Sequence, residues 1–242
     1  MGTVAEIELQ RAYYDDRWAR TAHANLLQLN KAIAILDGIR MINLLSPKIL
    51  DLGCGNGWFA AILGRFGPTT GVDLSPVAIQ KAQARYPDVE FLEGDLFNMP
   101  LPREAFDIVV AQQVMEHVED QRGFVNLAAR VLRRGGHFLL VTPNALNLSH
   151  WTQEQIEAFT GGLQPIEKWL TRKQLRSLLV PRFKIKCLRT ITPGIGDRGI
   201  LRLAHSVKLA KTLKPLGLLT FYHYALLRAG FGLHILAIAQ RL

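Results

Sequence analysis

The chain has 242 residues, 29 Lys or Arg, 20 Asp or Glu and a formal net charge of +9, and it is long enough to bury a substantial single core. Its two cysteines, Cys54 and Cys187, have no companion His or Cys residues at metal-ligand spacing. The sequence therefore does not support a structural zinc site. With few thiols and with Glu6 and Glu8 early in the chain, we expect a cytoplasmic protein without an export signal.

Apolar runs alternate with helical patterns along most of the chain. We expect strands near 48–52, 70–74, 89–92, 106–111, 136–141, 183–190 and 233–240. Helices are expected near 24–45, 56–66, 76–86, 121–132 and 171–180, the last capped by Thr171 and ended by Pro181. This alternation predicts an α/β fold with a doubly wound, mostly parallel sheet of seven strands.

A glycine-rich turn follows the first expected strand, within ILDLGCGNGWF at 49–59. Gly53 and Gly55 leave the backbone N–H groups open to a ligand where the next helix begins. Asp73 ends the following strand, about twenty residues beyond Gly53, where an acidic side chain accepts hydrogen bonds from ribose hydroxyls. A purely structural turn is the alternative, but Asp51 and Asp73 in register favour a nucleoside site.

Two residues indicate which nucleoside this turn binds. Trp58 stands where a dinucleotide fingerprint has its third small residue, which disfavours a pyrophosphate. Asp51 lies at the mouth of the turn, where a carboxylate repels phosphates and attracts the ammonium and sulfonium groups of S-adenosylmethionine (SAM). The charge pattern therefore favours a cationic nucleoside.

From about Pro47 through Val141 the chain resembles the class I SAM-dependent methyltransferases, which implies a Rossmann-like sheet. The resemblance rests on four motifs in order: the glycine turn with GVDLS at 71–75, FLEGDLFNMPLP at 91–102, FDIVVAQQVMEHVED at 106–120 and VLRRGGHFLLVTPN at 131–144. The EHV at 116–118 is similar to small-molecule members, including the ubiquinone-pathway O-methyltransferases.

The resemblance implies specific cofactor contacts beyond the glycine turn. Asp95 would face the adenine amino group with the backbone of Leu96 beside it, although Asp95 could instead be only a loop carboxylate. Gln112 or Gln113 would line the cofactor after the fourth strand. Leu74, next to Asp73, completes the expected cofactor-binding set.

His117 is the candidate catalytic residue. A histidine near neutral pKa could remove a proton from a hydroxyl or phenol, but a packing or hydrogen-bonding role is the more common use of such a residue. Methyl transfer does not always need a base, because aligning the two reactants supplies much of the acceleration.

We expect one methyltransferase domain over 1–242, with an N-terminal helical lid at 1–46 and a core at 47–190 and 233–242. Tyr13, Tyr14 and Trp18 are aromatic residues of the lid that could cover SAM and acceptor, or could simply anchor the first helix. The remaining segment, 191–232, is a basic amphipathic insertion between the last two strands.

This insertion carries the excess charge. Residues 1–182 contain 19 Lys or Arg and 19 Asp or Glu, whereas 183–242 contain 10 basic residues and one acid. The pattern at 199–214 predicts an amphipathic basic helix, and 215–227 is apolar and aromatic. The alternatives for this segment are a cap that forms a wall of the acceptor pocket, a peripheral contact of 199–227 with anionic membrane, and a polyanion site. Arg228 interrupts the apolar run, which disfavours a transmembrane span.

We expect methyl transfer to a small molecule, with a hydroxyl of a sugar, quinol or lipid-linked intermediate as the acceptor. N- or C-methylation and a catalytically silent SAM-binding subunit are the alternatives. Nucleic acid is disfavoured because AQQVMEHV stands where DNA amino-methyltransferases have an Asn-Pro-Pro-Tyr type motif. No metal site is expected, and the oligomeric state is open.

Overall fold

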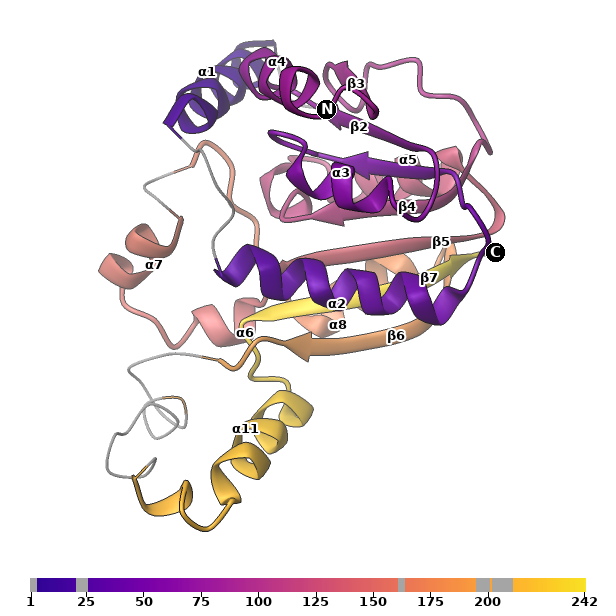
Figure 1. Ribbon diagram of the computed structural model, residues 1–242. Coiled ribbons are helices and arrows are strands. Elements are labelled where there is room, and N and C mark those ends of the chain that lie inside the picture. The colour runs from indigo at the N-terminus through magenta and orange to yellow at the C-terminus, as the bar shows by residue number, and fades with distance from the viewer. Residues whose placement is uncertain (1–3, 21–25, 161–163, 195–200, 202–210) are drawn as a thin grey trace.

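A computed structural model describes residues 4–20, 26–160, 164–194, 201 and 211–242. A seven-stranded sheet with the order β3-β2-β1-β4-β5-β7-β6 forms the centre of the fold (Figure 1). The strands are β1 (Ile49–Leu52), β2 (Thr69–Asp73), β3 (Glu90–Glu93), β4 (Phe106–Gln112), β5 (Leu132–Pro143), β6 (Phe183–Ile191) and β7 (His234–Arg241).

Strands β1 to β5 pair in parallel, and β7 is antiparallel to both of its neighbours, β5 and β6. The order reverses between β1 and β4, which is where ligands bind in doubly wound sheets. All seven predicted strands are present, so the predicted fold class is confirmed. The largest difference is β5, which begins at Leu132 rather than near residue 136.

Helices cover both faces of the sheet. The helices before β4 are α1 (Val4–Arg20), α2 (Leu26–Ile42), α3 (Trp58–Leu63) and α4 (Pro76–Arg85). Those after β4 are the 3-10 turn η1 (Met115–His117), α5 (Gln121–Val131), α6 (Ala145–Leu148), α7 (Gln153–Thr160), α8 (Arg172–Leu179) and α11 (Leu218–Ala229). Thr171 caps α8 through a capping box, as predicted.

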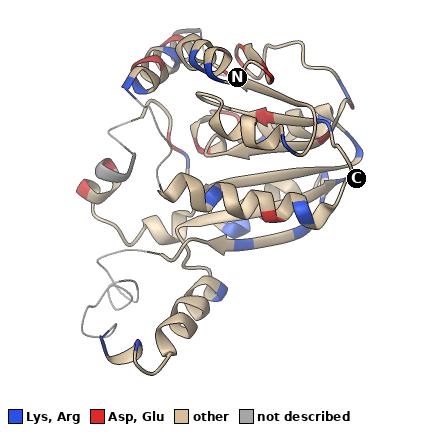
Figure 2. Cartoon of the chain, viewed as in Figure 1, with Lys and Arg blue, Asp and Glu red and all other residues tan. Residues whose placement is uncertain are grey.

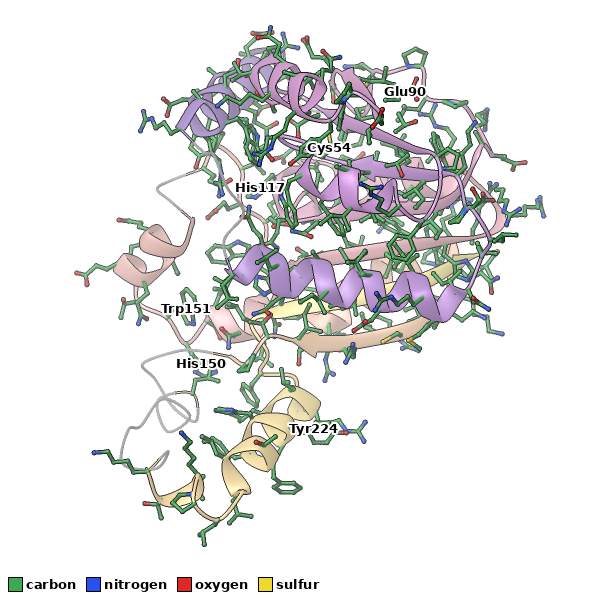
Figure 3. The ribbon with its side chains drawn as sticks, viewed as in Figure 1. Cys54, Glu90, His117, His150, Trp151 and Tyr224 are labelled. Carbon is green, nitrogen blue, oxygen red and sulfur yellow. The ribbon has the colours of Figure 1, made fainter. Side chains whose placement is uncertain are left out.

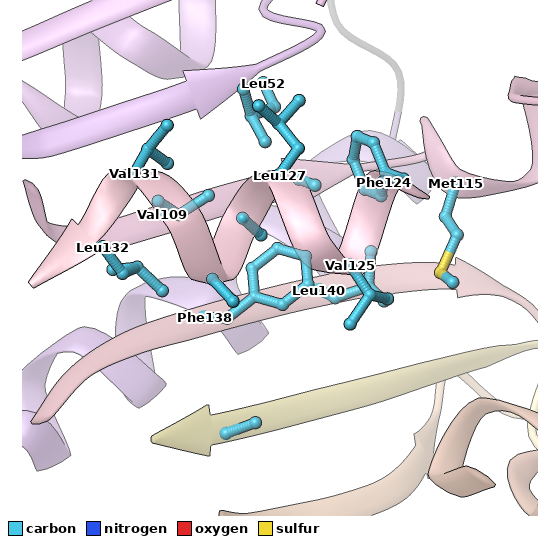
Figure 4. Packing of buried hydrophobic residues seen from close by; sticks show 14 of the residues in the cluster. Leu52, Val109, Met115, Phe124, Val125, Leu127, Val131, Leu132, Phe138 and Leu140 are labelled. Atoms are coloured by element: carbon cyan, nitrogen blue, oxygen red, sulfur yellow. The ribbon is translucent and has the colours of Figure 1, made fainter. Parts of the chain in front are cut away.

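The central strands are buried on both faces because each face meets a helical layer. On β4, Ile108 and Val110 pack with α2 and α3, while Val109 and Ala111 pack with α5. Phe138 of β5 lies among the α5 residues in Figure 4, with its ring centroid 6.3 Å from that of Phe124. Such continuous apolar runs are typical of parallel strands and explain why the sequence pattern located them.

The segment between β6 and β7 carries α11, which extends away from the sheet in Figure 1. Its carboxyl end is fixed to the core, because Thr190 donates a hydrogen bond to the Leu227 carbonyl at 2.6 Å. Arg228 lies in its last turn, Lys211 and Lys214 precede its first turn, and Asp and Glu do not occur on it (Figure 2). Most of the helix predicted at 199–214 lies outside the described residues. No described helix is both long and apolar enough to cross a membrane.

Candidate functional site

A cavity of about 380 Å³ opens at the carboxyl ends of the parallel strands, under α1 and beside α2. This volume lies within the range of roughly 300–1,000 Å³ that is usual for ligand pockets. The ten residues predicted as site residues all line it: Asp51, Gly53, Gly55, Asp73, Leu74, Asp95, Leu96, Gln112, Gln113 and His117. The fold thus brings together residues that are spread over 67 positions of sequence.

The glycine turn is compact at both predicted positions. Gly53 and Gly55 have φ angles of 74° and 54°, in the left-handed region that favours glycine. A Cβ on Gly53 would lie 2.3 Å from Cγ2 of Val114, and one on Gly55 would lie 2.3 Å from Cζ2 of Trp18. Both glycines are therefore required by backbone conformation and by close packing, in addition to any contact with a ligand.

Two buried carboxylates flank this turn. Asp51 is 3% exposed, and burial, followed by repulsion from Asp73, raises its pKa from 3.8 to about 8. The Asp73 carboxylate accepts hydrogen bonds from the backbone N–H groups of Gly55 at 2.8 Å and Ser75 at 3.0 Å. Burial raises the pKa of Asp73, and these hydrogen bonds partly offset that effect. Neither carboxylate forms an ion pair with a cationic side chain in the described part of the chain. This end of the cavity therefore favours a positively charged ligand.

The turn after β3 supplies the next predicted residues. Asp95 accepts hydrogen bonds from the Phe97 backbone at 3.1 Å and from Asn98 Nδ2 at 2.7 Å, so its side chain also shapes this turn. Leu96 is buried beside it. Across the cavity, the buried Gln112 Oε1 has no hydrogen-bond partner in the described part of the chain. A buried amide oxygen of this kind fits a donor on a bound ligand.

A second polar group lies over the ends of β4 and β5. Gln113 has a φ angle of 60°, and its Oε1 accepts a hydrogen bond from Lys31 Nζ of α2 at 2.9 Å. Lys31 is only 6% exposed, and burial lowers its pKa to about 8. Sequence reasoning missed Lys31, although it continues the apolar i, i+4 stripe of Leu27, Ile35 and Ile39, and a cation in such a stripe is the signal that could have identified it.

Glu116 and His117 of η1 complete this group. Glu116, which the sequence analysis did not select, is 1% exposed, and burial raises its pKa to about 7. Its carboxylate accepts a hydrogen bond from the Thr142 hydroxyl at 3.0 Å. His117 Nδ1 lies 3.0 Å from the Ile166 carbonyl oxygen, and Nε2 lies 3.8 Å from Glu116 Oε1 (Figure 3 labels His117).

This geometry determines the tautomer of His117. A carbonyl oxygen can only accept a hydrogen bond, so Nδ1 carries the hydrogen and Nε2 keeps its lone pair when the ring is neutral. Burial lowers the pKa of His117, so the neutral form is favoured near pH 7. The arrangement can therefore accept a proton at Nε2.

Helix α1 covers the cavity. Trp18 and Tyr14 line it, whereas Tyr13 packs edge-on against Tyr14 with ring centroids 5.3 Å apart. The carboxyl end of α1 is held on α4, where Lys81 Nζ donates to the Trp18 carbonyl at 2.6 Å. Gln10 donates to the His117 carbonyl at 2.6 Å. These contacts put aromatic residues of α1 against both the glycine turn and η1.

Comparisons with known proteins agree on one family. A model described as a methyltransferase domain matches residues 50–140. A probable S-adenosylmethionine-dependent methyltransferase of Mycolicibacterium smegmatis is 40% identical over 102 residues, which are 42% of this chain and 40% of that protein. A demethylmenaquinone methyltransferase of Chlorobaculum tepidum is 36% identical over 115 residues, 47% of this chain and 46% of that protein. The chain thus matches less than half the length of these curated relatives.

The fold comparison extends over the whole chain. The crystal structure of magnesium protoporphyrin IX methyltransferase from Synechocystis with bound SAH has a TM-score of 0.63 and 18% identity, and covers 98% of this chain and 100% of that chain. At this identity the similarity concerns the fold. Residues 50–140 therefore carry a methyltransferase domain similar to those of S-adenosylmethionine-dependent methyltransferases, whose cofactor is S-adenosylmethionine.

Proposed function

We propose that this chain binds SAM in the cavity and transfers its methyl group to a hydroxyl of a small molecule. The observation that carries the proposal is the pair of buried carboxylates, Asp51 and Asp73, which share one cavity without a cationic partner in the described structure. A ligand that brings positive charge and hydroxyl donors would offset their burial. SAM brings both, in its sulfonium and ammonium groups and its ribose.

The other predicted residues fit the same ligand. Each carboxylate oxygen of Asp73 accepts one backbone hydrogen bond and retains acceptor capacity for ribose hydroxyls. Asp95 and Leu96 lie after β3, where we place the adenine. Gln112 Oε1 requires a donor, and the ammonium group is a suitable one.

We place the acceptor beside His117. When bound, SAM supplies an electrophilic methyl group, and the chain's task is to hold the acceptor oxygen and take its proton. His117 Nε2 is the group suited to that proton, because the Ile166 carbonyl fixes the hydrogen on Nδ1. The buried Glu116 nearby would stabilise the protonated ring. This supports O-methylation over N- or C-methylation.

The acceptor itself is a sugar, quinol or lipid-linked hydroxyl compound in this proposal. The relative named as a demethylmenaquinone methyltransferase supports the quinol class. Apolar and aromatic lining from Leu27, Ile166 and Trp169 also suits a quinol better than a free sugar. The cytoplasmic location and the division into lid, core and insertion stay predictions.

The test is methyl transfer from SAM labelled in its methyl group to a panel of quinols, sugars and amines. We expect label in a quinol product, with transfer at subsaturating SAM reduced in Asp73→Ala and retained in Glu93→Ala. Glu93 is a matched control because it ends the neighbouring strand β3, is exposed and does not line the cavity. Label only in amines would contradict O-methylation, and SAM binding without transfer to any acceptor would favour the silent SAM-binding subunit.

We also propose that α11 contacts anionic membrane. Leu218, Phe221 and Ala225 fall on one helical face, and Phe221 is 68% exposed. The exposed Lys211 and Lys214 lie just before this face. Basic residues beside an exposed apolar face are typical of helices that lie in the headgroup region.

Co-sedimentation with vesicles tests this contact. Each Lys near an anionic surface should contribute about 1 kcal/mol, and salt should weaken the attraction. We therefore expect binding to anionic vesicles at low salt, reduced in a Lys211→Gln and Lys214→Gln double variant. The control is Lys184→Gln with Lys186→Gln, two exposed lysines of β6. Equal binding to anionic and neutral vesicles would contradict the proposal.

A further inference from the structure

Lys31 is 6% exposed, and no other Lys or Arg in the described part of the chain is buried. It lies on the inner face of α2, where that helix packs on β4 and β5, and its ammonium group reaches the cavity. Removing an ammonium group from water is costly unless another group compensates it. Lys31 Nζ donates a hydrogen bond to the neutral amide oxygen of Gln113 at 2.9 Å, and this contact does not neutralise its positive charge.

The nearest opposite charge does not meet Lys31 directly. Glu116 attracts Lys31, yet the described ion pairs do not join them. The Glu116 carboxylate instead contacts Thr142 and lies 3.8 Å from His117 Nε2. Three basic side chains also face Lys31 and repel it when charged: Arg17 of α1, His117 of η1 and His234 of β7. The two buried charges therefore face one cavity with space for a ligand.

Other atoms on this side of the cavity also require a partner. Gln113 Nε2 and Glu167 Oε1 are buried and have no hydrogen-bond partner within the described structure. An amide N–H beside an ammonium group offers two kinds of donor to one acceptor atom. The walls around them, Leu27, Ile166 and Trp169, are apolar. The site thus places one charged and one neutral donor, Lys31 and Gln113, beside apolar walls, with the Glu167 carboxylate as an acceptor nearby.

We propose that Lys31, with Gln113, binds a negatively charged oxygen of the methyl acceptor, so that acceptors are phenols, enols or carboxylic acids carried on an apolar body. This inference rests on the proposed methyl transfer and redefines its acceptor by charge: quinols, which are phenols, stay in the class, enols and carboxylic acids enter it, and sugars leave it. An ammonium group has three donors, of which one is directed to Gln113 Oε1. The other two are available to the acceptor oxygen. Aliphatic sugar hydroxyls, which stay neutral, would gain far less from a buried cation.

The test uses benzoate, 4-nitrophenol and the neutral benzamide as probes, titrated by NMR into free protein and into protein saturated with SAH. We expect benzoate or 4-nitrophenolate to bind more tightly than benzamide. Lys31→Met should weaken the anions about tenfold to a hundredfold, the loss of one charge-assisted hydrogen bond, and leave benzamide unchanged. Preference for benzoate indicates carboxylic acid acceptors, and preference for the phenolate indicates phenols or enols.

Arg40→Met is the matched control, because Arg40 is an exposed cation on the same helix with 72% of its side chain accessible. A second measurement compares pH profiles. Benzoate stays ionised at neutral pH, so its binding to wild type should weaken as pH rises through the Lys31 pKa of about 8. Asp51 and Glu116 ionise in the same range and also oppose an anion, so the Lys31→Met profile is subtracted, and the difference should show the Lys31 step. A bound anion favours the protonated amine, so the midpoint should lie somewhat higher in the complex.

Failure of this inference is distinct from failure of the proposed function. Three results would show that the Lys31 inference is wrong: no probe binds, anions and benzamide bind equally, or Lys31→Met changes no affinity. If SAH still binds in that case, the methyltransferase proposal stands. If SAH fails to bind, the proposed function is wrong, and the probe titrations into free protein still decide the role of Lys31.

Discussion

Asp51→Asn should stabilise the free protein at alkaline pH while weakening its binding of SAM. The wild-type carboxyl is 3% exposed and its pKa is raised to about 8 by burial and by Asp73. A carboxyl with a raised folded-state pKa contributes full stability below its unfolded pKa of about 4, and that contribution is lost as pH rises through about 8. The amide of Asn has nearly the same shape and does not ionise.

The size of the effect follows from the two pKa values. A rise from 3.8 to about 8 corresponds to a cost on the order of 5 kcal/mol for ionising Asp51 in the folded protein, relative to the unfolded chain. Between these values the wild type should lose stability by about 1.4 kcal/mol for each pH unit relative to the variant. Glu116 acts in the same direction and is present in both proteins. Asp73 is present in both as well, but its repulsion with Asp51 is lost in the variant, so the difference reports Asp51 together with that repulsion.

Urea denaturation at several pH values between about 5 and 9 measures this difference. Calorimetry then compares SAM with SAH, which lacks the sulfonium charge. SAM should release a proton on binding to wild type near neutral pH and release less on binding to Asp51→Asn, because the ligand's charge favours the ionised carboxyl. Parallel stability curves for the two proteins would refute the assignment of a raised pKa to Asp51. Equal SAM affinities would refute its role at the cation.

Three further changes test separate parts of the molecule. His117→Ala should lower turnover by roughly 10²-fold and leave the SAH dissociation constant unchanged; full activity would remove His117 from the chemistry. Trp18→Ala should speed SAH dissociation in stopped-flow measurements, because its indole lies against Gly55 under α1, and an unchanged rate would show that α1 is not a wall of the cofactor site. Phe138→Ala should lower the free energy of unfolding by about 3–5 kcal/mol in urea, since its ring is fully buried between Phe124 and Phe183; a loss below about 1 kcal/mol would contradict that packing.

The sheet could be predicted because its strands carry their own signal. Strands β1, β2 and β4 are apolar runs bounded by turn residues, and their burial on both faces follows from helices packing on each side. The glycine turn and Asp73 could be placed from spacing alone, since a strand, a turn and a helix bring them to one edge of the sheet. Whether these residues contact SAM stays a prediction.

Other features depended on tertiary packing. The apolar stripe of α2 contains Lys31, but only the packing of α2 on β5 shows that this lysine is buried and faces the cavity. Glu116 lies beside His117 in sequence, but its burial and its hydrogen bond from the Thr142 hydroxyl of β5 follow from the fold. Helices α6 and α7 were not predicted, because they are short, and the start of α6 is set by the Asn144 cap rather than by an apolar period.

The central claim is that Asp73 and the glycine turn form a SAM site, and calorimetric titration of SAH into wild type, Asp73→Ala and Glu93→Ala tests it most directly. Wild type and Glu93→Ala should bind one SAH per chain with similar affinity. Asp73→Ala should bind about tenfold to a hundredfold more weakly, because the ribose hydroxyls lose a charged acceptor. Absence of SAH binding by wild type, or an unchanged dissociation constant in a folded Asp73→Ala protein, would contradict the account.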